Sequence, residues 1–193
     1  MVEVGRHINI EILTLTEVTG ISGREGNFEV ELVQHPRYVD TEKCIACGLC
    51  AEKCPKRVTD EYNEAFGKRR SIYVPYSQAV PLKYAIDPQN CIYLIKNKCR
   101  FCEEVCPTGA INFQDTEKEL SLNVGSVVLS TGFNHFDPAK LDYLGYNQHP
   151  DIVTSMGFER LLSATGPYGG HLRLPSDKKK EKEPKKIAWL QCV

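Results

Sequence analysis

Eight of the nine cysteines in the chain fall into two short groups whose spacing is typical of a metal-binding site. The first group has the pattern Cys-x2-Cys-x2-Cys-x3-Cys-Pro and runs from Cys44 to Pro55. Four thiols this close in sequence cannot all pair as disulfides without severe strain. Thiolates are soft ligands that bind iron and zinc. The group therefore predicts a metal centre rather than a disulfide scaffold.

The second group repeats the first one along the chain. It consists of Cys91, Cys99, Cys102, Cys106 and Pro107. The repeat includes the residues before the cysteines, because Val39-Asp40 precedes Cys44 as Ile86-Asp87 precedes Cys91. The second copy differs by an insertion between Cys91 and Cys99, roughly Leu94 to Lys98. The chain thus contains two copies of one cysteine-bearing unit.

This spacing resembles that of bacterial ferredoxins with two [4Fe–4S] clusters, in which the fourth cysteine of each run ligates the other cluster. The resemblance implies two sets of ligands. The first set is Cys44, Cys47, Cys50 and Cys106. The second set is Cys54, Cys91, Cys99 and Cys102. The longer gap between Cys91 and Cys99 departs from the ferredoxin pattern and bears on the shape and exposure of the second cluster.

Zinc is the main alternative to iron and sulfur. The pairs Cys44/Cys47 and Cys99/Cys102 have the spacing of one tetrahedral zinc site, which would make the chain a zinc-stabilised interaction module. That interpretation leaves four cysteines and both Cys-Pro steps unexplained.

Length and composition exclude several classes of function. The chain has 193 residues, a net charge of −1 and 41% hydrophobic residues, so it shows no charge bias toward nucleic acid. No stretch approaches the roughly 18 apolar residues of a membrane span, and the N-terminus lacks the apolar segment of a signal peptide. Nine cysteines without a secretion signal predict a location in the reducing cytoplasm.

The elements around the cysteines are expected to include β-structure before them. Ile8, Ile10 and Ile12 alternate with polar residues, as do Phe28, Val30 and Leu32 further on. With a turn over 21–27 between them, these segments predict a β-hairpin. A lone hairpin is marginally stable in water, so we expect it to belong to a larger domain.

The segment between the two groups is long for a simple ferredoxin. Its basic cluster Lys68-Arg69-Arg70 is either a docking site for an acidic partner or, more simply, a solvated loop. Three tyrosines are candidates to pack over a cluster or in an ordinary core; they are Tyr73, Tyr76 and Tyr84.

The residues after the cysteines predict mixed structure. Strands are expected where Leu120, Leu122 and Val124 alternate and at Val127–Leu129, which leads into the turn Ser130-Thr131-Gly132. A helix is expected over 154–164 and a charged linker over 176–186. Residues 187–193 have the continuous apolar character of a buried strand, within which Cys192 is expected to be a buried thiol. A buried strand at the end of the sequence indicates a truncated protein.

Four segments resemble the A subunit of heterodisulfide reductase, a flavin and iron–sulfur protein family of anaerobes. They are Pro36–Asp40, Tyr73–Pro81, Ser126–Phe133 and Lys186–Val193. The resemblance implies an α+β chain in which a two-[4Fe–4S] ferredoxin-like domain, residues 38–115, is inserted into part of an α/β thioredoxin-reductase-like flavin domain. Residues 1–37, 116–175 and 187–193 would belong to that flavin domain.

The same resemblance places Thr131 and Gly132 close to FAD, although Ser130 stands where such flavoproteins have alanine. No Gly-x-Gly-x-x-Gly fingerprint occurs in the chain, so the segment that would bind the FAD pyrophosphate is not present. We therefore expect FAD in the full-length protein but no tight FAD binding and no complete active site in this chain.

The function implied by the resemblance is single-electron transfer through two [4Fe–4S] clusters to or from FAD. The implied partners are the other subunits of a heterodisulfide-reductase-like complex and ferredoxin-, hydrogenase- or dehydrogenase-type electron partners. A free-standing dicluster ferredoxin is the alternative. It is less consistent with the β-rich flanks and the apolar residues 187–193, which an independent carrier would have to expose.

Overall fold

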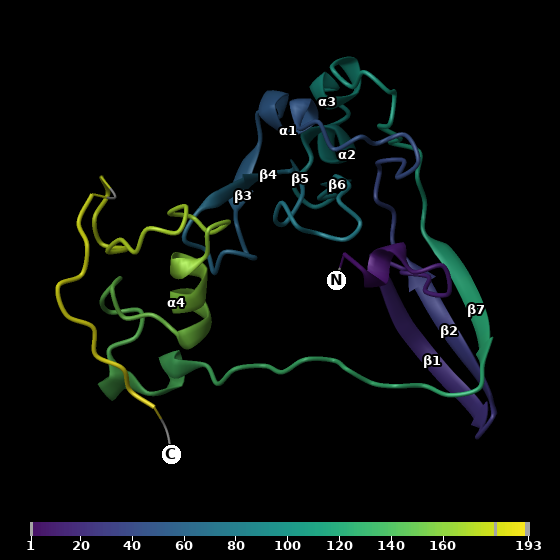
Figure 1. The fold of residues 1–193 in the computed structure, drawn as a ribbon. Helices are drawn as coiled ribbons and strands as arrows, with labels where there is room; N and C mark the ends of the chain where they lie inside the picture. The colour runs from purple at the N-terminus through teal and green to yellow at the C-terminus, as the bar shows by residue number, and fades with distance from the viewer. Residues whose placement is uncertain (1, 180, 192–193) are drawn as a thin grey trace. The chain divides into compact units, whose positions relative to one another are not determined.

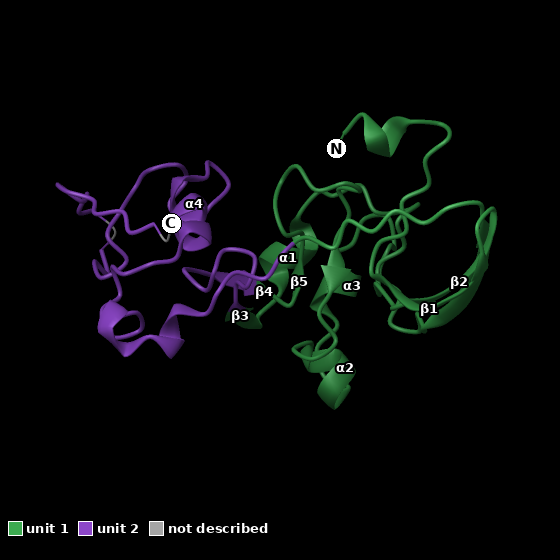
Figure 2. Cartoon of the chain, turned by 90° about the horizontal axis from the view of Figure 1, so that it is seen from below, with its two compact units in different colours: residues 1–58, 70–132 green, residues 59–69, 133–193 purple. Residues whose placement is uncertain are grey.

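The computed structural model describes residues 2–179 and 181–191 (Figure 1). The chain divides into two compact units, shown in separate colours in Figure 2. The first unit comprises residues 1–58 and 70–132, and the second comprises residues 59–69 and 133–193. Within the described ranges, no helix combines the length and the apolar character needed to cross a lipid bilayer.

A three-stranded antiparallel sheet joins the two flanks of the cysteine-bearing residues. Its strands are β1 (Thr16–Arg24), β2 (Asn27–Gln34) and β7 (Lys118–Val124), in the order β1-β2-β7 (Figure 1). Strand β2 pairs with β7 from Phe28 opposite Val124 to Gln34 opposite Lys118. Residues 38–115, which we call the cysteine region, therefore leave and re-enter the sheet between two neighbouring strands.

The predicted hairpin is confirmed, but its boundaries are wrong. Strand β1 starts at Thr16, preceded by the short 3-10 helix η1 (Val4–Arg6), and the turn lies at 25–26. Residues 8–12 form no strand, and Ile8 is 95% exposed. Alternation of polar and apolar residues predicts that a strand would have one polar and one apolar face. A strand forms, however, only where a neighbouring strand pairs with its backbone N–H and C=O groups. No described strand pairs with residues 8–12.

Short elements build the cysteine region around the repeat seen in the sequence. They are α1 (Leu49–Lys53), β5 (Ile72–Tyr73), β6 (Ala85–Ile86), α2 (Ile92–Lys96) and α3 (Phe101–Glu104). In one copy Ile72 pairs with Ile86, and in the other Ile111 forms an antiparallel bridge with Val39. These two pairs are equivalent, because Asp87 donates its N–H to Ser71 and Asp40 donates its N–H to Ala110.

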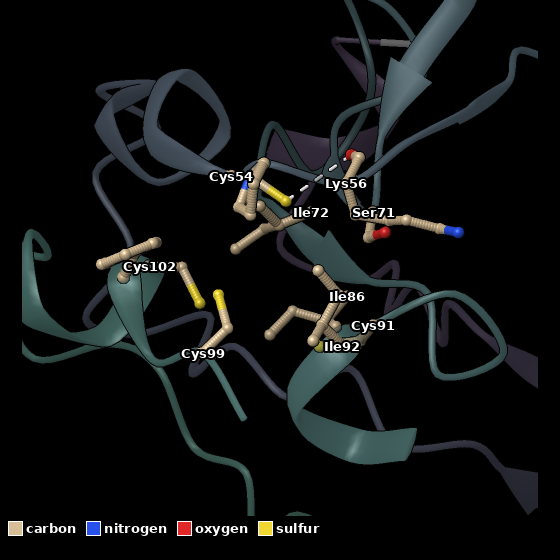
Figure 3. Close-up of a pocket in the computed structure, with 11 residues that line it drawn as sticks. Cys54, Lys56, Ser71, Ile72, Ile86, Cys91, Ile92, Cys99 and Cys102 are labelled. Atoms are coloured by element: carbon tan, nitrogen blue, oxygen red, sulfur yellow. Dashed lines mark hydrogen bonds between the residues drawn. The ribbon is translucent and has the colours of Figure 1, made fainter. Parts of the chain in front are cut away.

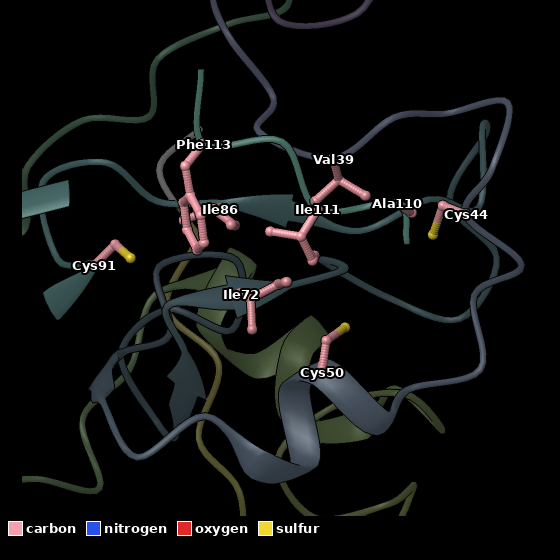
Figure 4. Close-up of a cluster of buried hydrophobic side chains, with 9 residues drawn as sticks. All are labelled: Val39, Cys44, Cys50, Ile72, Ile86, Cys91, Ala110, Ile111 and Phe113. Carbon is pink, nitrogen blue, oxygen red and sulfur yellow. The ribbon is translucent and has the colours of Figure 1, made fainter. Parts of the chain in front are cut away.

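The core of the region consists of aliphatic side chains that lie among the cysteines. Figure 4 shows Ile72 and Ile111 between Cys44 and Cys50 on one side and Cys91 on the other. Ile72 is 2% exposed and Ala110 is 1% exposed. The turn after Pro107 thus brings the small Ala110 and the aliphatic Ile111 against the cysteines.

A hairpin interrupts one copy of the repeat, which sequence reasoning did not foresee. Strands β3 (Arg57–Thr59) and β4 (Lys68–Arg70) pair with each other and separate Lys56 from Ser71. In the other copy, Cys106 is the counterpart of Cys54. It is followed by an uninterrupted turn, in which the Ala110 N–H donates a hydrogen bond to Cys106 Sγ. We call residues 57–70 the excursion.

The tip of the excursion packs on helix α4 (Ser155–Leu162) within the second unit. A Cβ atom on Gly157 would lie 3.1 Å from Cε2 of Phe66, so a larger residue there would require the Phe66 ring to shift by a few tenths of an ångström. The guanidinium carbon of Arg160 lies 4.9 Å from the centre of the Tyr62 ring. Helix α4 confirms the helix that is predicted over 154–164. The second unit also contains the 3-10 helices η2 (Pro138–Lys140) and η3 (Asp142–Leu144).

The N-terminus of α4 offers a test of local stability. The Thr154 hydroxyl accepts a hydrogen bond from the Gly157 N–H at 3.0 Å. Thr154→Ala should cost about 1 kcal/mol of local stability, the usual value of such a cap. Amide exchange in α4 should then be about fivefold faster. The exposed Thr116→Ala is the matched control and should leave this exchange unchanged.

Two predicted strands do not form in the described residues. Residues 127–129 form no strand, and Val128 is 86% and Leu129 73% exposed. Residues 187–191 also lack strand pairing, and Leu190 is 81% exposed, although the Trp189 ring packs edge-on against Phe158 at 5.5 Å. Both apolar runs lack a neighbouring strand, which is what buries such a run. Cys192 lies outside the described residues.

Candidate metal centres

The first cysteine loop is shaped by Asp40 and by two left-handed residues. The Cys44 N–H donates to the Asp40 carbonyl at 2.9 Å, and the Asp40 carboxylate accepts from the Glu42 N–H at 2.9 Å. Ala46 and Gly48 then have positive φ angles of 57° and 88°. The chain curls around Cys47 and enters α1, which carries Cys50 and ends before Cys54.

The second loop repeats this arrangement around Asp87. The Cys91 N–H donates to the Asp87 carbonyl at 3.0 Å, and the Asp87 carboxylate accepts from the Gln89 N–H at 3.1 Å. The predicted insertion between Cys91 and Cys99 lies in α2 and the left-handed turn at Asn97 that ends it. The extra residues are accommodated as a helical turn, and Cys99 returns to the pocket described below.

One pocket is lined by the four cysteines of the first set. It contains about 330 Å³ of space free of protein atoms, part of it open to solvent. Val39, Tyr84 and Ile111 are among its other lining residues. Three of the cysteines come from the first loop and α1, whereas Cys106 comes from the end of the second motif. Of the three candidate tyrosines, Tyr84 is the one that lines this pocket.

Another pocket is lined by the four cysteines of the second set. It contains about 340 Å³, again partly open to solvent, and Ile72, Ile86 and Phe101 also line it. Figure 3 shows Cys99 and Cys102 side by side, with Cys54 and Cys91 on other walls. Here Cys54 is contributed by the first motif, so each pocket draws one cysteine from the other copy of the repeat.

Burial makes two of these thiols poor acids in the absence of a metal. Burial raises the pKa of Cys50 to about 12, and neighbouring cysteines add to the effect. Burial likewise raises the pKa of Cys102 to about 12. A thiolate in such surroundings needs a positive charge beside it. A metal centre supplies that charge, since a coordinating thiol is deprotonated outright.

Cys106 has a different environment. Burial acts to raise its pKa, but hydrogen bonds from the backbone and from Thr108 outweigh this and hold the pKa below the usual value. The Ala110 N–H donates to Cys106 Sγ at 3.2 Å, and the Thr108 hydroxyl lies 3.6 Å from the same sulfur. Donors directed at a sulfur favour its ligating, ionised form.

The donor chemistry of both pockets fits an iron–sulfur cluster. Each pocket offers four soft thiol ligands on an otherwise largely apolar wall. Within the described part of the chain, no three His, Cys, Asp or Glu side chains are arranged to hold a single metal ion. The four thiols of each set line about 330 to 340 Å³ of space free of protein atoms, which suits a multi-iron group.

Sequence reasoning missed two basic residues near the first set. The Lys83 ammonium donates to the Cys44 carbonyl at 2.5 Å. The Arg37 guanidinium donates to the carbonyls of Lys83 and Tyr84, each at 3.4 Å, and to the Thr14 hydroxyl at 2.6 Å. Burial lowers the pKa of Arg37, while attraction to Cys44 opposes this. Both residues lie outside the cysteine motifs, so spacing carried no signal for them.

The predicted flavin contacts do not lie at the cysteine pockets. Thr131 and Gly132 are exposed in an irregular segment and line neither pocket, and Gly132 has a positive φ of 73°. The basic cluster 68–70 forms β4 of the excursion, not an irregular loop.

Comparisons with known proteins agree with this geometry. Residues 43–110 match the family described as a 4Fe-4S dicluster domain. The whole chain is 40% identical to the A subunit of the H(2):CoB-CoM heterodisulfide,ferredoxin reductase of Methanothermobacter marburgensis. It is also 40% identical to the iron-sulfur A subunit of the CoB–CoM heterodisulfide reductase of Methanocaldococcus jannaschii, and 43% identical to such an A subunit of Methanopyrus kandleri. In each case it spans 28% of the relative's length. The chain thus carries a 4Fe-4S dicluster domain and is homologous, over its whole length, to a segment of the A subunit of heterodisulfide reductase.

Proposed function

We propose that the chain is the electron-relay segment of a heterodisulfide-reductase-like flavin and iron–sulfur oxidoreductase. Single electrons would pass through two [4Fe–4S] clusters, one held by the first set of cysteines and one by the second. The observation that carries the proposal is the composition of the two pockets, in which three cysteines of one motif meet the fourth cysteine of the other. When bound, such clusters supply one-electron redox chemistry.

The protein residues have the tasks of ligation, orientation and exclusion of water. Asp40 and Asp87 fix the two loops through their hydrogen bonds to the backbone. Ile72 and Ile111 fill the space between the two sets and keep water from it (Figure 4). No acid, base or nucleophile is required, because the cofactor performs the chemistry.

The flanking sheet supports the proposal that the cysteine region is inserted into another domain. Strands β2 and β7 are direct neighbours although the cysteine region lies between them in the sequence. We assign residues 1–37, 116–175 and 187–193 to the flavin domain of the whole protein, with 176–186 as a linker. Thr131 and Gly132 would lie near its FAD.

The proposed partners are the other subunits of a heterodisulfide-reductase-like complex and a ferredoxin, the carrier that appears in the name of the Methanosarcina mazei relative. Hydrogenase- or dehydrogenase-type donors are further candidates of the same chemical class. The clusters and free thiols would require a reducing compartment, which we propose to be the cytoplasm.

Anaerobic loading of the chain with iron and sulfide tests the proposal. The loaded chain should contain about eight iron atoms. After reduction with dithionite, its EPR spectrum should show two interacting paramagnetic centres, since the two sets share one core. Unloaded chain treated only with zinc is the control for a colourless metal site.

Other outcomes would contradict the proposal in distinguishable ways. About four iron atoms per chain would mean that one of the two sets does not assemble. Colourless protein that retains zinc and rejects iron would identify a zinc-stabilised module. Detection of a native product of 21.8 kDa by an antibody against the chain would favour a free-standing carrier.

A further inference from the structure

The two cysteine sets differ in the hydrogen bonds to their equivalent fourth cysteines. In the first set, Cys106 Sγ accepts a hydrogen bond from the Ala110 N–H at 3.2 Å. In the second set, Cys54 Sγ lies 3.7 Å from the Lys56 carbonyl oxygen (Figure 3). A ligating thiolate has no proton to donate, so Cys54 would face the negative end of a carbonyl dipole.

The excursion is the cause of this difference. Ser71 is the counterpart of Ala110 in the repeat, but its N–H donates to the Lys56 carbonyl at 3.3 Å instead of to a sulfur. Residues 57–70 separate Lys56 from Ser71, so the tight turn found after Cys106 cannot form after Cys54. No backbone N–H bond to Cys54 Sγ occurs among the described residues.

Positive charge is also distributed unequally. Lys83 is partly buried, and its ammonium bonds to the carbonyl of Cys44, a first-set cysteine. The ion pairs found among the described residues do not include Lys83. The neighbouring Arg37 carries a permanent charge, part of which is offset by Asp115. Of these two cations near the first set, Lys83 is therefore the one whose positive charge is less neutralised by carboxylates.

The cations near the second set are paired with a carboxylate, exposed to solvent or directed away from the cysteines. Arg100 is paired with Glu103 at 2.8 Å. Lys98 is exposed, so water and salt screen its charge. Lys56 is partly buried and is among the residues that line the pocket of the second set, but its side chain runs away from the four cysteines (Figure 3). Solvent adds a smaller difference: Cys47 of the first set is exposed, whereas its counterpart Cys99 in the second set is partly buried, and the equivalent Cys44 and Cys91 are both buried.

We propose that these differences place the first set at a higher reduction potential than the second, so that an electron entering the chain rests preferentially at the first set. Lys83 is the positioning residue for this preference. The physical reason is that reduction adds a negative charge, which nearby cations, N–H donors and water stabilise. The inference rests on the function and the ligand sets proposed above, and it adds a direction to the relay.

The test is an EPR-monitored redox titration of the loaded chain after its iron has been counted. Two variants that each empty one pocket identify the signals of the two sets: Cys44→Ala/Cys47→Ala and Cys99→Ala/Cys102→Ala. The charge variants are Lys83→Met, with Lys83→Arg as the conservative rescue. Lys98→Met is the matched control beside the second set. Thr108→Val removes the hydroxyl near Cys106. It should also lower the reduction potential of the first set, and it leaves Lys83 unchanged.

In the unsubstituted chain, the first set should be reduced before the second. In a chain that holds one electron, the electron is either at the first set or at the second. Lys83→Met should lower the ratio of the first population to the second about tenfold, which is equivalent to about 59 mV for one electron. Lys83→Arg should restore the ratio, Thr108→Val should lower it less, and Lys98→Met should leave it unchanged.

Reduction of the second set first would overturn the inference, and so would equal shifts of both sets in Lys83→Met and Thr108→Val. An iron content well below about eight per chain would instead contradict the proposed function, and the inference would fall with it.

Discussion

Replacing Cys54 should reduce iron binding in the pocket of the second set. It should leave iron binding unchanged in the pocket of the first set, which contains the other three cysteines of the motif of Cys54. The clearest design starts from Cys99→Ala/Cys102→Ala, which retains only the first set and about four iron atoms. Adding Cys54→Ala should leave this iron content unchanged. Adding Cys106→Ala should lower it, because Cys106 lines the pocket with Cys44, Cys47 and Cys50. Iron analysis and visible absorbance under argon measure both outcomes.

The reciprocal background is the control for general instability. In Cys44→Ala/Cys47→Ala, only the second set remains, and the roles of Cys54 and Cys106 should reverse. If instead Cys54→Ala removed iron from the first set, each motif would build its own centre. The proposed exchange of fourth ligands would then be wrong.

Ile72→Ala should have the largest effect on stability of any single core truncation in the cysteine region. Ile72 is 2% exposed, pairs with Ile86 and lines the pocket of the second set. Shortening a buried isoleucine costs about 2–5 kcal/mol, because the surroundings collapse only partly into the cavity. Since proteins with bound cofactors often unfold irreversibly, the effect is best measured as faster loss of cluster absorbance at fixed temperature.

Ile95→Ala is the matched control for this truncation. Ile95 lies in α2 of the same region and is 55% exposed, so the same atoms are removed without a cavity. Its effect should stay within about 0.5 kcal/mol. Equal losses in the two variants would show that Ile72 does not fill a space on which the centres depend.

The parts of the site that could be predicted from the sequence are those fixed by local spacing. The cysteine motifs and the repeated Val39-Asp40 and Ile86-Asp87 pairs are local signals, and the Asp40 and Asp87 carbonyls each accept the N–H of the following cysteine. The helix begun by Thr154 was equally local, since the cap and the apolar positions lie within one short segment.

The parts that could not be predicted depend on the path of the chain. Lys83 reaches Cys44 only because the segment between the motifs returns to the first loop, and nothing near Lys83 in sequence indicates this. The apolar runs 8–12 and 127–129 have the pattern of strands, but a strand forms only where a neighbour supplies hydrogen bonds. The position of the excursion within the repeat was hidden because Ser71 and Ala110 are different residue types.

The pairing of β2 with β7 links the stability of the sheet to the state of the cysteines. These strands can meet only when the intervening cysteine region has been closed into a loop, and the entropy cost of closure grows by about 0.6 kcal/mol for each doubling of loop length. Cys44 and Cys106 lie near the two ends of that loop. A metal group bound by both, as proposed, would act as a cross-link that shortens the segment still to be closed. Metal loading and pairing of Gln34 with Lys118 should therefore favour each other, so amide exchange in β7 reports whether the distant pockets are filled.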